Sequence, residues 1–158
     1  MKSGDREGDT MQYKRRDYIA KIDYVFYNEG EIRKAVRDKK ADPGVHHGKG
    51  PSSGGYVSDP TASAALHEIM PIKAVVVDGK RLEKPEKWLR VVSETYSHLK
   101  DQQCQIVRSR FRGDSYQVTC MDCHISPATY NRTISDARMY AAAVAAQLGL
   151  IQIIKITE

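Results

Sequence analysis

Apolar side chains recur every three or four positions over residues 127–148, and this spacing predicts an amphipathic helix with one buried face. The positions on that face are Tyr130, Ile134, Ala137, Ala141, Val144 and Leu148. Ser126 is the expected N-cap of this helix, and Pro127 fits its first position, where no backbone N–H is needed. Gly149 is expected to end it.

A shorter helix is predicted immediately before it. Asp114 is a favourable N-cap residue, and Gln117 completes a start that resembles a capping box. This helix should extend to about Asp122, and residues 123–125 should form a turn. The pattern predicts a helix-turn-helix over Asp114–Leu148, although a plain helical hairpin in a bundle has the same spacing.

The outer face of the second helix has the character that a DNA-reading helix needs, because its side chains are small, polar or cationic. These residues are Ala128, Asn131, Arg132, Ser135 and Arg138. Further expected DNA contacts lie at the two helix starts and on the arginines before the motif, namely Tyr116, Gln117, Ser126, Pro127, Thr129, Arg108, Arg110 and Arg112. The three arginines suit phosphate contacts, but a solvated charged face explains them equally well.

Five other segments show helical spacing of apolar residues. They are Arg16–Tyr27, Glu31–Lys40, Pro60–Met70, Glu86–Leu99 and Gln102–Arg112. Trp88 should anchor the core from the fourth segment, while Asp101 and Gly113 should cap and end the last one. Together with the motif, these segments predict a mainly α fold, a helical bundle.

Lys73–Glu83 is the strand-like passage before the carboxyl-terminal tail. Asp78-Gly79 separates a valine run from a second extended segment, and this dipeptide is a strong signal for a two-residue hairpin turn. A small β-hairpin is therefore predicted, which must pack on helices or on another subunit to be stable. Gly149–Glu158 alternates enough to form a short strand or a packed arm.

Changes in composition along the chain suggest its division into domains. Residues 1–12 are polar and are expected to form a disordered tail, and residues 41–59 are rich in Gly, Pro and Ser, as flexible linkers are. We therefore expect an amino-terminal tail with short helices over 1–40, then the linker. A helical DNA-binding domain should follow over 60–158, with the helix-turn-helix at 114–148.

Bulk composition favours a soluble protein with an anionic partner over a membrane protein or a disulfide-rich secreted protein. The 158 residues are 41% hydrophobic and carry a net charge of +5, with a pI near 9.1 and a mean hydropathy of −0.55. The charge favours an anionic partner, although many soluble enzymes are as basic. No apolar run approaches a membrane span, and the start does not resemble an export signal, so no membrane partner is expected. Three cysteines, an odd number, favour a reducing cytoplasm over a disulfide framework.

The segment Cys120–His124 matches the attachment motif of c-type haem. Haem attachment of this kind occurs outside the cytoplasm, and the match overlaps the predicted helix-turn-helix. Zinc is the other alternative, because Cys104, Cys120 and Cys123 with either His98 or His124 could supply four ligands. The chain has only one close-spaced pair of this kind, so buried cysteines and no metal or cofactor are expected. No catalytic constellation is recognisable, and an enzyme is not expected.

Three runs resemble the RinA-like phage late-gene transcriptional activators. They are KPEKWLRVVSETYSHL, QIVRSRF and HISPATYNRTISDARMYAAAVAAQLGLIQI, and the resemblance covers roughly Ser58–Ile153. It implies a relation to the promoter-reading fourth region of bacterial sigma factors. The implied partners are double-stranded promoter DNA and host RNA polymerase, in the cytoplasm of a bacterial host. Ser126–Tyr130 would then begin the recognition helix, with Asn131 and Arg132 at its reading positions.

The chain departs from that family at several positions. Cys120 stands where Ala is usual, and His124 stands at a turn position that is often Gly, where a left-handed backbone would cost about 1 kcal/mol or more. The recognition helix also has few arginines. A DNA-packaging component resembling a small terminase subunit, or a zinc- or redox-responsive regulator, remains an alternative, and a homodimer is left open.

Overall fold

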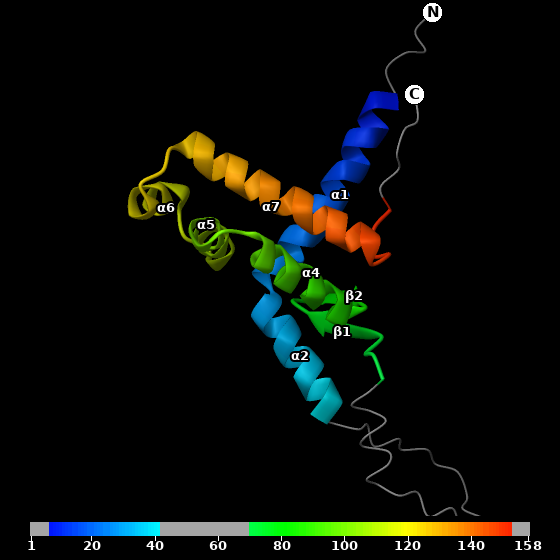
Figure 1. Ribbon diagram of the computed structural model, residues 1–158. Helices are drawn as coiled ribbons and strands as arrows, with labels where there is room; N and C mark the ends of the chain where they lie inside the picture. The colour runs from blue at the N-terminus through cyan, green and yellow to red at the C-terminus, as the bar shows by residue number, and fades with distance from the viewer. Residues whose placement is uncertain (1–6, 42–69, 153–158) are drawn as a thin grey trace, which may run out of the picture. The chain divides into compact units, whose positions relative to one another are not determined.

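The computed structural model describes residues 7–41 and 70–152, and within them the chain is mainly helical with one small hairpin, as predicted. In chain order the elements are α1 (Glu7–Tyr27), α2 (Glu29–Ala41), β1 (Ala74–Val77), β2 (Lys80–Glu83), α4 (Pro85–His98), α5 (Asp101–Arg112), α6 (Tyr116–Cys123) and α7 (Pro127–Gln147) (Figure 1). The predicted linker and most of the predicted helix Pro60–Met70 lie outside the described residues. None of the described helices has both the length and the apolar character of a membrane span.

The chain divides into two compact units. The large unit comprises residues 1–29 and 87–158, and the hairpin unit comprises residues 30–86. This division differs from the predicted one, which placed residues 1–40 in a module of their own. The physical reason is that α1 packs against α5 and α7, so the first helix belongs with the carboxyl-terminal helices.

Helix α1 is longer than predicted, because it begins at Glu7 rather than at Arg16. The expectation of a disordered tail is therefore wrong for residues 7–12. Beyond Gly8 the sequence contains neither glycine nor proline before Asn28, so nothing in it interrupts an α-helix there.

The buried face of α1 is apolar, and its residues Ile22, Val25 and Phe26 are at most 5% exposed. The Phe26 ring lies 5.0 Å from that of Phe111 on α5 and 5.7 Å from that of Tyr96 on α4, measured between centroids. Aromatic pairs at such distances add to the free energy of burial. One aromatic cluster thus joins three helices of the large unit.

Helix α4 supplies several buried side chains to the core. Trp88 is buried as predicted, and Val91, Val92 and Thr95 are buried as well. The Thr95 hydroxyl donates a 2.7 Å hydrogen bond to the Val91 carbonyl, which satisfies the polar atom inside the core. Leu89, Tyr96 and Leu99 are half-buried.

Helix α5 ends where the sequence predicts, at Gly113, which adopts a left-handed conformation with φ of 95°. Its N-cap residue is Lys100 rather than the predicted Asp101. The Lys100 backbone N–H donates to the Gln103 side-chain oxygen at 3.0 Å, so a residue of the first turn of the helix satisfies the N–H of the N-cap residue. Helix α7 is likewise followed by Gly149 with φ of 71°, and residues 149–152 form no strand.

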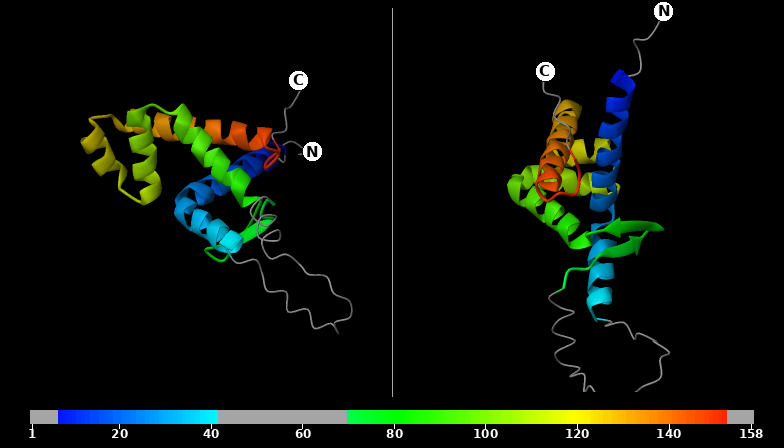
Figure 2. Two further views of the ribbon diagram at one scale, coloured as in Figure 1. Left: turned by 60° about the horizontal axis from the view of Figure 1, so that its bottom comes forward. Right: turned by 90° about the vertical axis from the view of Figure 1, so that its right-hand side faces the viewer.

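In the hairpin unit, β1 and β2 pair antiparallel around Asp78-Gly79, and both turn residues have positive φ, 52° and 68° (Figure 2). These angles suit the predicted two-residue hairpin turn. The strands bury one face, formed by Val75, Val77 and Leu82. Helix α2 buries Ile32 and Val36, which lie one turn apart.

Candidate nucleic-acid interface

The turn between α6 and α7 is closed by backbone hydrogen bonds. His124 follows α6 in a left-handed conformation, with φ of 52° and ψ of 48°. Its N–H donates to the Met121 carbonyl at 3.3 Å, and the Ile125 N–H donates to the Cys120 carbonyl at 3.0 Å. These hydrogen bonds satisfy two of the last carbonyls of α6. The turn follows α6 at His124 and Ile125, so Cys123, which was predicted to lie in the turn, is still part of the helix.

The start of α7 also matches the prediction. The Ser126 hydroxyl accepts a hydrogen bond from the Thr129 backbone N–H at 3.2 Å, and Pro127 occupies the first turn. The hydroxyl groups of Ser126 and Thr129 lie 3.0 Å apart. These two predicted DNA contacts therefore already serve the cap, and the cap fixes the direction in which α7 leaves the turn.

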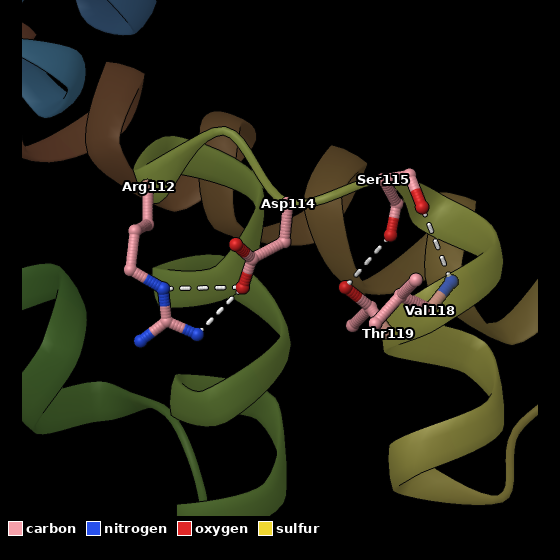
Figure 3. Close-up of polar contacts among 5 residues, drawn as sticks. All are labelled: Arg112, Asp114, Ser115, Val118 and Thr119. Carbon is pink, nitrogen blue, oxygen red and sulfur yellow. Dashed lines mark hydrogen bonds and ion pairs between the residues drawn. The ribbon is translucent and has the colours of Figure 1, made fainter.

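Helix α6 begins one residue later than predicted, and Ser115 is its N-cap instead of Asp114. The Ser115 hydroxyl accepts from the Val118 N–H at 3.3 Å, and its carbonyl accepts from the Thr119 hydroxyl at 3.2 Å (Figure 3). Asp114 instead accepts two hydrogen bonds from Arg112, at 2.6 and 3.1 Å. Asp114 and Ser115 are adjacent, and both residue types can cap a helix. Because the Asp114 carboxylate is paired with Arg112, Ser115 forms the cap. Gln117 is exposed and takes no part in a capping box.

The outer face of the first half of α7 is exposed as the spacing predicts. The exposed residues there are Pro127, Ala128, Thr129, Asn131, Arg132, Ser135 and Asp136. Thr133, Ile134 and Ala137 are buried between them, which confirms the phase of the helix. Arg138 departs from the expectation, because its side chain is only 26% exposed and forms two hydrogen bonds, at 2.7 and 2.8 Å, with Asp23 on α1.

Two of the three arginines of α5 have partners within the large unit. The Arg108 guanidinium lies over the Tyr96 ring, 4.4 Å from its centroid, and Arg112 is paired with Asp114. The Nε of Arg110 is buried and has no hydrogen-bond partner in the described part of the chain. Burial raises the pKa of Tyr96 to about 12, with a contribution from the charge of Glu29, and the nearby Arg108 opposes this shift.

Tyr130 lies on the inner seam of α7, as predicted, and is 3% exposed. Its ring centroid is 6.2 Å from that of Tyr116, the first residue of α6, which is itself 46% exposed. On α6, Val118 is 50% exposed, whereas Cys120 is buried. The Tyr130 ring is therefore positioned to set the spacing between α6 and α7.

The cysteines are free thiols in this structure. Cys120 and Cys123 are buried, and the Cys104 thiol donates to the Tyr96 carbonyl at 3.2 Å. His98, a ligand in the zinc alternative, stacks on Tyr140 with 3.9 Å between ring centroids. Across residues 7–41 and 70–152, no three His, Cys, Asp or Glu side chains gather in a way that would hold a metal ion.

Two features were missed by sequence reasoning, one in this region and one in the hairpin unit. The Gln102 side chain donates to the Cys123 carbonyl at 3.1 Å and so holds the end of α6 from α5, a contact across 21 positions that no local pattern signals. The second feature is the group of exposed cations of the hairpin unit, including Lys34, Arg37, Lys73 and Lys84. The excess of basic residues in α2 was a signal for them.

Comparisons with known proteins return nothing: no family model, no curated protein and no solved structure matches the chain.

Proposed function

We propose that the chain is a sequence-specific DNA-binding protein that inserts the first half of α7 into the DNA major groove. The observation that carries the proposal is the exposed, capped start of α7 directly after the closed turn at His124. Asn131 and Arg132 are exposed one turn into this helix, and Arg132 has no partner among the described residues. Asparagine and arginine are the side chains that most often read adenine and guanine there.

The resemblance to phage late-gene activators supplies the biological setting of the proposal. In that setting, the chain binds a promoter of phage or prophage late genes and contacts host RNA polymerase through another surface. The polar face of α7 supports the DNA contact, and the polymerase contact rests on the resemblance alone. The proposed place of action is the bacterial cytoplasm.

Selection from a random duplex library, followed by footprinting on the source genome, tests the DNA contact. The wild type should enrich a short motif, and Asn131→Ala with Arg132→Ala should remove the enrichment while the fold is retained. Removal of a base contact should weaken binding by about 1–3 kcal/mol. Met139→Ala, on an exposed residue further along α7, is the matched control. A wild type that enriches no motif would contradict the proposal, and run-off transcription on an enriched site tests activation.

A further inference from the structure

Within the residues that the structure describes, the excess of positive charge is larger on the hairpin unit. Residues 30–41 and 70–86 contain nine lysines and arginines against five aspartates and glutamates. Residues 7–29 and 87–152 of the large unit contain twelve such bases against ten acids over a much longer stretch. Among the described residues, the unit without the helix-turn-helix therefore has the greater excess of positive charge.

Three lysines of this unit meet at the open end of the hairpin, where β1 begins and β2 ends. The Lys84 backbone N–H donates to the Lys73 carbonyl at 2.8 Å, which holds these two residues opposite each other. The Lys39 ammonium group donates to the carbonyl of Ala74 at 2.6 Å, so the end of α2 lies beside the same strand end (Figure 1). We name Lys39, Lys73 and Lys84 the base lysines.

Nearby acids do not balance the base lysines. Two glutamates lie at this end of the hairpin. The Glu86 carboxylate is paired with Lys40 and also accepts from the Ile72 backbone N–H at 3.1 Å, and the Glu83 carboxylate lies 3.9 Å from the Arg81 guanidinium. The carbonyl that Lys39 contacts is neutral. The ammonium groups of Lys73 and Lys84 have no partner among the described residues, and both side chains are exposed. Like charges held together repel, and a bound anion relieves that repulsion.

We propose that the base lysines, together with Lys34 and Arg37 on the exposed side of α2, bind the phosphates of duplex DNA. This is a second contact, independent of base sequence, and it adds to the contact proposed for α7. Only the choice of DNA as the polyanion rests on the proposed function. Lysines distributed over a helix and a hairpin suit a repeating row of phosphates, since each neutralises one charge without specific geometry.

The test measures the affinity of the full chain for a random-sequence duplex at a series of salt concentrations, with fluorescence anisotropy as the readout. The variant is Lys73→Gln with Lys84→Gln, and the control is Lys21→Gln with Lys100→Gln, which removes the same charge from exposed positions of the large unit. The slope of log affinity against log salt should fall by about 0.9 for each phosphate that the variant no longer neutralises. The control should keep the wild-type slope. Thermal melts of both variants establish that they fold.

Each outcome separates this inference from the proposed function. If the hairpin variant keeps the wild-type slope, the inference is overturned, whether or not α7 selects a motif. If the slope falls but no motif is ever enriched, the inference stands and the proposed function fails. Vesicles containing anionic phosphatidylserine provide a second arm. Binding to vesicles that depends on Lys73 and Lys84, with duplex binding unaffected, would also overturn the inference, because the anion would then be a membrane surface.

Discussion

Each compact unit contains cations committed to an internal contact and cations left open, and the open ones include Arg132 on α7 in the large unit and Lys73 and Lys84 at the open end of the hairpin in the other. In the large unit, Arg138 is paired with Asp23, Arg112 with Asp114, and Arg108 lies over an aromatic ring. In the hairpin unit, cations such as Lys73 and Lys84 are exposed and have no partner in the described residues. Net charge alone does not reveal this difference, because a cation committed to an internal contact stabilises the fold and one left open is available to an external anion.

The largest expected effect concerns packing under the exposed face of the large unit. Tyr130→Ala should lower the free energy of unfolding by about 3–5 kcal/mol, because it leaves a cavity between α6 and α7. Tyr130→Phe should keep most of the stability, since the Tyr130 hydroxyl is buried without a partner among the described residues. Asn131→Ala, on the exposed side, should change stability by less than about 0.5 kcal/mol. Urea denaturation measures all three, and a costly Asn131→Ala would show that the assigned faces are wrong.

The next effect compares the stability contributed by an arginine that is paired inside the protein with that contributed by an exposed arginine. Arg138→Ala should lower the free energy of unfolding by about 1.5–3 kcal/mol, because it removes two charge-assisted hydrogen bonds from a half-buried carboxylate. Arg37→Ala in the hairpin unit should change it by less than about 0.5 kcal/mol. A double-mutant cycle with Asp23→Ala isolates the energy of the pair. Equal losses from Arg138→Ala and Arg37→Ala would remove the contrast between paired and unpaired arginines.

Each unit contains a residue in the left-handed region whose replacement by glycine sharpens the comparison. His124 has φ of 52° and Lys84 has φ of 51°. Glycine relieves that strain, so His124→Gly and Lys84→Gly should each raise stability by about 1 kcal/mol. Only Lys84→Gly should also weaken binding to random-sequence DNA. Thermal melts and anisotropy titrations measure the two properties, and a loss of random-sequence binding from His124→Gly alone would reverse the assignment.

The smallest effect concerns the Lys40–Glu86 pair of the hairpin unit. Burial acts to raise the pKa of Glu86, but hydrogen bonds from Lys40 and from the Ile72 N–H, with the charge of Lys40, hold it below its ordinary value of 4.5. The stability from this pair is therefore present above pH 4.5 and is lost as pH falls through the lowered value. The Ile72 amide shift in an NMR titration should have its midpoint below 4.5, and Lys40→Gln should raise it. A midpoint at or above 4.5 would contradict the pairing.

Much of the local structure could be predicted from the sequence. The hairpin turn at Asp78-Gly79, the cap at Ser126 and the glycine stops at Gly113 and Gly149 depend on side-chain and backbone preferences within a few residues. The buried seam of α7 followed from spacing alone. One error arose where two neighbouring residues, Asp114 and Ser115, both suit the N-cap position. Arg112 is paired with the Asp114 carboxylate, and Ser115 caps the helix.

The sequence by itself therefore determined the helices, the hairpin and the exposed face that α7 offers. Only the tertiary structure decided which helices pack together and which charges stay open. Asp23 and Arg138 are 115 positions apart, and no local preference links them. Their pairing follows from the burial of the apolar face of α1 on α7, which brings the two charges together where water is scarce. The same reason applies to the base lysines, whose proximity results from strand pairing and from the contact of α2 with β1.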